Sequence, residues 1–108
     1  MSCLETKHDV EFPAEGVRVD SVFFVEGGRV VWFSINVSAW FKGEAHDVYR
    51  VDTAHGRLHE QKFWQSGEPE WLEEEGKEDY SREFAWFRRA VKDNCLRWLF
   101  KERWKNEG

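Results

Sequence analysis

The sequence has no long apolar run, no signal-peptide pattern and almost no cysteine. No segment approaches the ~20 consecutive apolar residues that a membrane-spanning helix needs, so we expect no membrane partner. The first residues, MSCLETKHDVEF, have neither the basic start nor the apolar block of a secretory signal. Cys3 and Cys95 form no CxxC or zinc-ligand spacing. These absences predict a cytoplasmic protein.

Aromatic residues, by contrast, are abundant. The 108 residues include seven Trp and nine Phe, and each large ring can bury on the order of 150–250 Å². A chain of this length predicts one domain with a compact core.

The net charge of −5 is unevenly distributed along the chain. Residues 68–79 carry seven carboxylates and one lysine, whereas residues 86–105 carry seven basic and two acidic side chains. The acidic and basic segments either face each other or face different partners. Two solvated surfaces are the simpler interpretation.

Two runs of β-branched and aromatic residues form the clearest pattern in the chain. They flank Gly27-Gly28, a pair typical of a two-residue hairpin turn. This predicts strands over residues 17–26 and 29–41, with Val25 opposite Val30 and Phe23 opposite Trp32. Residues 1–15 show no period, so we expect a flexible N-terminal lead-in followed by a single domain over residues 16–108.

Two further strands are predicted over residues 45–52 and 57–64. A three-residue loop, Lys42-Gly43-Glu44, sets the register of the first, because a two-residue loop there would bury Arg50 and Asp52 in the core. In the chosen register the polar side chains share the face of Ser34 and Asn36. These side chains are His46, Arg50 and Asp52.

The C-terminal segment has helical period from about residue 78 to residue 105. One apolar stripe is expected to cover the sheet; it consists of Tyr80, Phe84, Phe87, Val91, Cys95 and Trp98. The predicted fold is therefore α+β, a four-stranded antiparallel meander packed on one long C-terminal helix.

A second aromatic stripe lies on nearly the opposite side of the predicted helix and contains Trp86, Phe100 and Trp104. Exposed aromatic patches usually mark interfaces, and a twofold dimer is the commonest arrangement. We therefore expect a homodimer through this stripe. The rival interpretation is that residues 66–77 fold back over it.

Polar residues gather around the third predicted turn, in the segment YRVDTAHGRLHE. Cleavage of an RNA phosphodiester needs a base, an acid and a cation, and His and Arg supply these groups at neutral pH. The candidate catalytic residues are Arg50, Asp52, His55 and His59. The candidate substrate-binding residues, on neighbouring strands, are Trp32, Asn36, Trp40 and His46.

Two other interpretations of this segment are open. In the first it is a hairpin turn with no chemical role, where Asp52 accepts hydrogen bonds from turn amides and Arg50 pairs with Glu60 across the strands. In the second, a metal is held by His46, Asp52, His55 and His59. His55 and His59 are four residues apart. On a helix this spacing would place both side chains on one face, as in the zinc motif HExxH, but these two residues belong to a predicted hairpin. We therefore expect no metal or other cofactor.

The same segment carries a family resemblance. Residues 50–59, RVDTAHGRLH, resemble the R-Y-D-T-A-H-G-x-x-H signature of a small uncharacterised microbial domain family, with Val51 where an aromatic residue is usual. That signature is similar to the Arg-x-Asp-Asn-Ala-x-His pattern of TumE-type toxins of toxin–antitoxin systems. The resemblance covers roughly residues 30–61. It implies a toxin-like protein that acts on or binds RNA, with an antitoxin protein as partner.

Two classes of function follow from these patterns. The first is a toxin-like ribonuclease or RNA-binding protein that uses Arg50, Asp52, His55 and His59, with the basic helix attracting RNA. The second is a non-catalytic dimeric module whose work is protein interaction.

Overall fold

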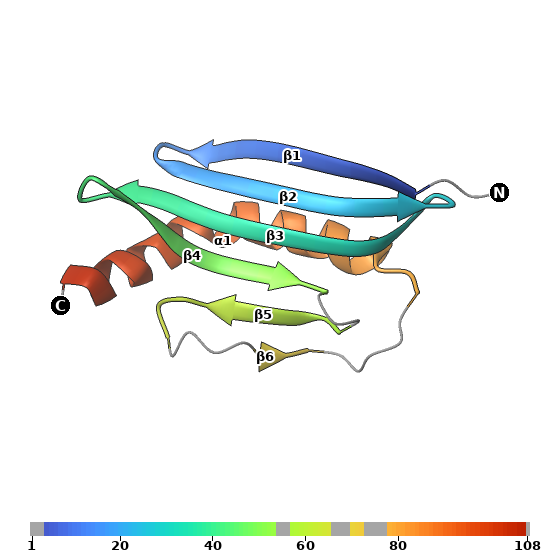
Figure 1. Ribbon diagram of the computed structural model, residues 1–108. Coiled ribbons are helices and arrows are strands. Elements are labelled where there is room, and N and C mark those ends of the chain that lie inside the picture. Colours follow the sequence, from blue (N-terminus) through green and yellow to red (C-terminus); the bar gives the residue numbers. More distant parts are fainter. Residues whose placement is uncertain (1–3, 54–56, 66–69, 73–77, 108) are drawn as a thin grey trace.

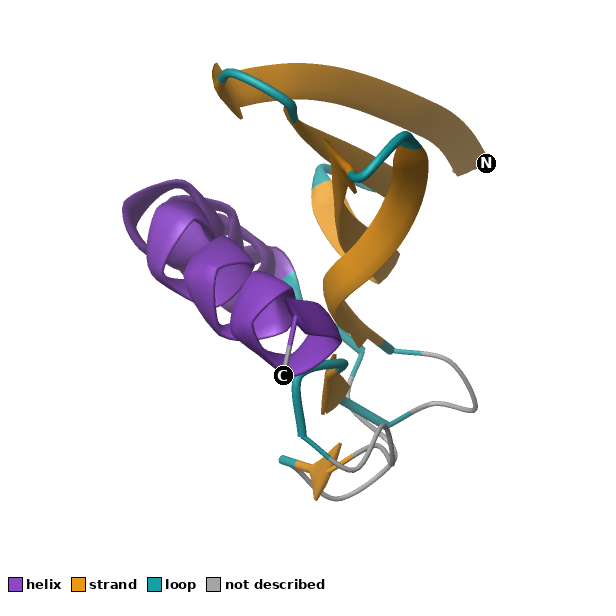
Figure 2. Cartoon of the chain, turned by 90° about the vertical axis from the view of Figure 1, so that its left-hand side faces the viewer, coloured by secondary structure: helices purple, strands orange, loops and turns teal. Residues whose placement is uncertain are grey.

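The computed structural model of the chain describes residues 4–53, 57–65, 70–72 and 78–107. Within these ranges, strands in chain order form one antiparallel sheet, and a single helix packs against one of its faces (Figures 1 and 2). The elements are β1 Leu4–Ala14, β2 Val17–Glu26, β3 Arg29–Phe41, β4 Glu44–Asp52, β5 His59–Lys62, β6 Glu70–Trp71 and α1 Ser81–Glu107. The predicted α+β class, with one long C-terminal helix on an antiparallel sheet, is confirmed.

The described sheet has six strands rather than the four predicted. β2 and β3 begin and end where the sequence predicted, and β4 begins one residue earlier. The strand expected over residues 57–64 is shorter, because β5 spans only His59–Lys62. β1 and β6 were not predicted.

β1 shows that the expected flexible lead-in is wrong for Leu4–Ala14. This strand pairs with β2, and its helix-facing side carries Asp9 and Glu11. Arg88 of α1 reaches these two carboxylates at 3.3 and 3.5 Å, and Lys92 reaches Glu11 at 3.1 Å. Because cations from the helix cover this side of β1, the charged residues of the strand face the helix. Val10, which lies opposite Asp20, is on the exposed outer side, so the usual alternation of buried apolar and exposed polar residues is inverted.

The first hairpin turns at Gly27 and Gly28, whose φ angles of 59° and 77° suit glycine and confirm the predicted two-residue turn. Val25 lies opposite Val30, also as predicted. A bulge at Val31 then shifts the register, so that Phe23 lies opposite Phe33 instead of Trp32. The shift brings Phe23 and Phe33 together on the helix side of the sheet.

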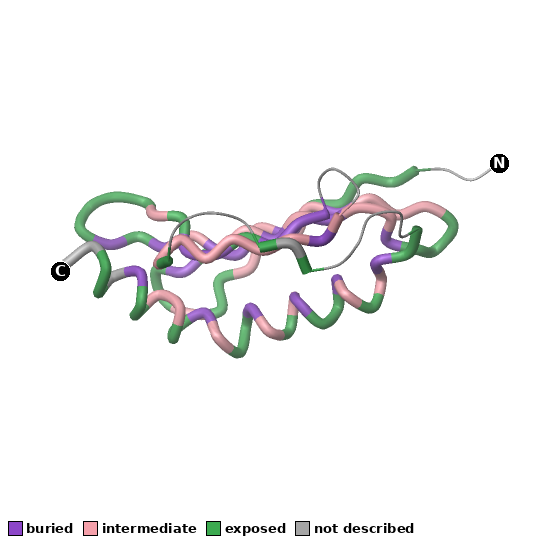
Figure 3. The backbone as a smooth tube through the Cα atoms, turned by 90° about the horizontal axis from the view of Figure 1, so that it is seen from below, coloured by how far each residue is buried: buried purple, intermediate pink, exposed green. Residues whose placement is uncertain are grey.

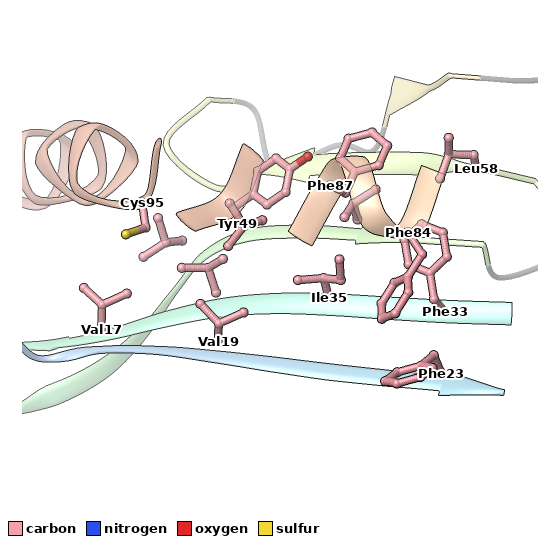
Figure 4. Packing of buried hydrophobic residues seen from close by; sticks show 14 of the residues in the cluster. Val17, Val19, Phe23, Phe33, Ile35, Tyr49, Leu58, Phe84, Phe87 and Cys95 are labelled. Atoms are coloured by element: carbon pink, nitrogen blue, oxygen red, sulfur yellow. The ribbon is translucent and has the colours of Figure 1, made fainter. Parts of the chain in front are cut away.

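The core lies between α1 and the inner face of the sheet (Figure 3). Phe33 is fully buried, and its ring centroid lies 5.2 Å from that of Phe84 and 6.5 Å from that of Phe87 (Figure 4). Farther along the helix, Trp98 stacks on Tyr49 with centroids 4.1 Å apart. The predicted inner stripe of the helix is therefore confirmed.

The start of α1 is tied to the beginning of β3. The Tyr80 N–H donates to the Val30 carbonyl at 2.8 Å, and the Val30 N–H donates to Ser81 Oγ at 3.0 Å. Asp79 Oδ1 accepts from the Ser81 N–H at 2.9 Å, as a helix-capping side chain does. These bonds set the direction in which the helix crosses the sheet.

Among the described residues, no helix combines the length and the apolar character that crossing a lipid bilayer requires.

Candidate functional site

The outer face of the sheet is the one that α1 leaves uncovered (Figure 2). Along β3, buried residues alternate with half-buried Ser34, Asn36 and Ser38. Asn36 lies opposite Arg50 of β4, and Ser34 lies opposite Asp52. The prediction that Arg50 and Asp52 share the face of Ser34 and Asn36 is therefore confirmed.

Asp52 is the centre of a three-residue cluster on this face. Its side chain is only 3% exposed, and its two carboxylate oxygens have different partners. Arg50 Nε donates to Oδ2 at 2.8 Å, and His59 Nε2 lies 2.8 Å from Oδ1. The cluster thus combines a buried carboxylate, a His that is 14% exposed and an Arg that is 48% exposed.

The β4–β5 register places His59 opposite Asp52. This register differs by one residue from the one that pairs Arg50 with Glu60, because Gln61 lies opposite Arg50. The buried residue Leu58 explains the difference, since the observed register turns Leu58 toward the core and His59 toward the outer face. An Arg50–Glu60 ion pair across the strands is therefore wrong.

Glu60 instead faces the helix side, where the Tyr49 hydroxyl donates to its Oε2 at 2.6 Å. The pKa of Tyr49 is raised above its ordinary range, mainly because the phenol is buried and secondly because of this hydrogen bond. Tyr49 accordingly remains a donor at neutral pH and holds Glu60 away from the outer face.

The contact with Asp52 defines how His59 presents its ring. A carboxylate accepts the proton on Nε2, which leaves Nδ1 of the neutral ring with a lone pair. Nδ1 lies 3.4 Å from the Arg57 carbonyl, which accepts a weak hydrogen bond when the ring is protonated. A His oriented by a buried carboxylate in this way is equipped to take up and release a proton.

The four candidate substrate-binding residues have different settings. Trp32 is half-buried and stacks on Phe24, with centroids 4.6 Å apart and planes 24° apart. Trp40 is 64% exposed on the outer side of β3. Asn36 lies between these two rings along β3 and approaches Asp47 at 3.4 Å.

His46 is not on the outer face, so the prediction that it shares the face of Ser34 and Asn36 is wrong. The turn between β3 and β4 has two residues, Lys42 and Gly43, whose φ angles are 55° and 75°. A bulge at Val48 then restores the predicted register from Tyr49 onward but leaves His46 opposite Ala39 on the core side. Its ring stacks on Phe41 at 3.9 Å. The predicted three-residue loop gave the correct register for Tyr49 and Val51 and the wrong face for His46.

A second ionic cluster on the outer face was missed by the sequence analysis. His8 Nε2 lies 3.1 Å from Asp20 Oδ1, and Arg18 donates to both Asp20 oxygens at 2.9 and 3.0 Å. Burial opposes ionisation of Asp20, but the bonds from Arg18 and His8 outweigh burial and lower the pKa of its carboxyl. The sequence signal for this cluster was that Arg18 and Asp20 are two residues apart in a predicted strand, which places them on one face. His8 joins them because β1, which was not predicted, pairs with β2.

Two further interpretations of the site concern His55 and the candidate set of metal ligands. His55 falls in residues 54–56, outside the described ranges, so its place relative to Asp52 and His59 stays a prediction. Within the described ranges no group of three or more His, Cys, Asp or Glu side chains is arranged to hold a metal ion. His46 and His59 lie on opposite faces of the sheet, so the candidate metal set containing both is not assembled.

Comparison with known proteins yields no relative: no protein-family model, curated protein or solved structure matches this chain.

Proposed function

We propose that the chain is a toxin-like protein that binds and cleaves single-stranded RNA on the outer face of its sheet. The observation that supports this proposal most is the Arg50–Asp52–His59 cluster, in which a buried carboxylate orients a His on the side of the sheet opposite α1. Residues 50–59 also resemble the signature of the uncharacterised microbial domain family, which is in turn similar to the pattern of TumE-type toxins, and this supports the same assignment. That resemblance also adds an antitoxin protein as a partner.

The proposed chemistry is an internal transfer at an RNA phosphate. His59 Nδ1 accepts the proton of a ribose 2′-hydroxyl, and the 2′-oxygen attacks the neighbouring phosphorus. The bond from phosphorus to the 5′-oxygen breaks, and that oxygen receives a proton from His55, which we assign as the acid. The products are a 2′,3′-cyclic phosphate and a 5′-hydroxyl.

Arg50 and Asp52 have supporting roles in this scheme. Arg50 uses Nε to bond Asp52, which leaves its two terminal nitrogens for the oxygens of the pentacovalent phosphate. Asp52 is a positioning residue, because it holds the ring of His59 and stabilises the imidazolium that forms. Trp40 offers an exposed ring on which an unpaired base can stack.

The test uses two end-labelled strands of one sequence, one RNA and one DNA. We expect the purified protein to cleave the RNA and leave the DNA intact, because DNA lacks the attacking 2′-hydroxyl. Mass spectrometry of the fragments should show cyclic phosphate ends. Cleavage of both strands would contradict the mechanism, and cleavage of neither would contradict the enzymatic function.

A non-catalytic dimeric module is the second candidate function. The observation that favours it is the exposure of Trp86, Phe100 and Trp104, at 63%, 69% and 71%. These rings form two separate patches, since Trp86 and Phe100 are 14 residues or about 21 Å apart on the helix. Between them the same side of the helix carries exposed Arg89, Asp93 and Arg97.

Sedimentation tests this candidate. A homodimer through the helix predicts twice the 13.0 kDa chain mass at micromolar concentration. The double variant Trp86→Glu/Trp104→Glu should then sediment as a monomer with an unchanged circular dichroism spectrum, because two buried carboxylates per subunit oppose association. A monomeric parent protein would contradict the dimer.

A further inference from the structure

A hollow of about 460 Å³ lies where the end of α1 meets the segment after β5. Three aromatic rings and two lysines line it: Trp64, Phe100, Lys101, Trp104 and Lys105. Its volume falls within the roughly 300–1,000 Å³ typical of small-ligand sites. We call these five residues the aromatic–lysine cup.

The walls of the cup are held by contacts between the two segments. Lys105 Nζ donates to the Phe63 carbonyl at 2.5 Å, and Lys101 Nζ lies 5.6 Å from the centre of the Trp64 ring. Trp64 in turn stacks against Trp98, with centroids 5.9 Å apart. Each ammonium group has three N–H donors, so Lys105 keeps two for a ligand.

The charge of the cup selects an anionic ligand. Both charged residues among those that line it are lysines, and none of these residues is acidic. The open rings of Phe100 and Trp104 select a flat, apolar surface next to that negative charge. A nucleobase attached to a phosphate has both properties.

The cup also lacks the groups that would read a particular base. Apart from indole N–H groups and the two ammonium groups, its lining side chains offer no hydrogen-bond donor or acceptor. Stacking combined with cationic contact to phosphate is the sequence-tolerant mode of single-strand binding. A free nucleotide would find few groups there to fix it.

We propose that the aromatic–lysine cup binds one nucleotide of a single-stranded RNA, with its base against Trp104 and Phe100 and its phosphate at Lys101 and Lys105. This inference rests on the proposed function, for which it supplies a second contact with the substrate strand. Trp64 follows His59 by five residues, which span at most roughly 17 Å. The cup lies on the helix side of the sheet and the outer-face cluster on the other, so a bound strand reaches the cup by passing around the end of β5.

Fluorescence anisotropy of a labelled hexauridylate tests the cup, in a His59→Ala background that prevents cleavage. Trp104→Ala should weaken binding about 10-fold or more, the usual effect of removing a stacking ring. Trp86→Ala is the matched control, because this Trp is similarly exposed on the same helix but does not line the cup. It should change binding less than twofold.

The lysines are tested by the salt dependence of the same binding. Lys101→Gln with Lys105→Gln should lower the slope of log affinity against log salt by about 0.7, because the two lysines contact one phosphate and each phosphate contact on a single strand contributes roughly that much. Lys7→Gln, an exposed lysine on β1, is the control and should leave the slope unchanged. Thermal unfolding of each variant confirms that the fold is retained.

Several outcomes would overturn the cup assignment. The first is that the Trp104→Ala variant binds RNA as tightly as its parent. The second is that Trp104→Ala and Trp86→Ala lose RNA affinity equally. The third is that adenosine monophosphate displaces the RNA as readily as unlabelled hexauridylate does. Displacement at lower concentration by an acidic, Trp-containing peptide would assign the cup to a protein partner instead. Binding that depends on Trp104 in a protein that cleaves no RNA would support the cup and reject only the proposed catalysis.

Discussion

Replacing His59 with alanine is expected to lower the rate of RNA cleavage by about 10²- to 10⁴-fold, the usual contribution of a general acid or base. The physical reason is that Asp52 holds the Nε2 side of the ring at 2.8 Å, so the proton is moved at Nδ1, which lies next to the Arg57 carbonyl. We expect the same loss for His55→Ala. Single-turnover cleavage of a labelled RNA at saturating protein measures the effect directly, and circular dichroism checks the fold.

The outer face offers a matched control for this experiment. His8 contacts Asp20 at 3.1 Å on the same face, in a pair of similar composition, and its side chain is far more exposed than that of His59. His8→Ala should leave the cleavage rate within about twofold of the parent. Equal rates in the His8, His55 and His59 variants would remove His59 and His55 from the mechanism.

The largest loss of stability is expected from Phe33→Ala. The ring is fully buried beneath the helix, in contact with Tyr80, Phe84 and Phe87. Its removal leaves a cavity and should lower the free energy of unfolding by about 3–5 kcal/mol. Urea denaturation followed by far-ultraviolet circular dichroism measures this loss.

Trp32 provides the comparison for Phe33. It is the preceding residue on the same strand, but it is half-buried on the outer face and stacks on Phe24. Trp32→Ala should lower the free energy of unfolding by less than half as much. Similar losses in the two variants would mean that the outer face is packed as tightly as the helix side.

Local patterns were sufficient to predict the central elements. Gly27-Gly28 between two apolar runs specifies the first hairpin, because only residues that tolerate positive φ fit both positions of its turn. The stripe from Tyr80 to Cys95 specifies the buried side of α1, because a helix on a sheet must turn its apolar residues inward. Alternation along β3 likewise identified the face that carries Arg50 and Asp52.

Features that depend on a single inserted residue were not predictable in the same way. The bulge at Val48 compensates for a shorter turn, and so Tyr49 lies where expected while His46 changes face. Either combination of turn and bulge satisfies the apolar pattern of Tyr49 and Val51. The choice is made by Val48, which is also fully buried in the structure.

The sequence by itself determined that β2, β3, β4 and α1 exist and which sides of them are apolar, because periodicity is a local property of the chain. Only the tertiary structure decided that Leu4–Ala14 is a strand and that Asp52 bonds both Arg50 and His59. Helix residues Arg88 and Lys92 stabilise β1 from across the fold, and the burial of Leu58 sets the register that brings His59 to Asp52. Contacts of this kind join residues far apart in sequence or depend on a one-residue shift, and no local pattern carries that information.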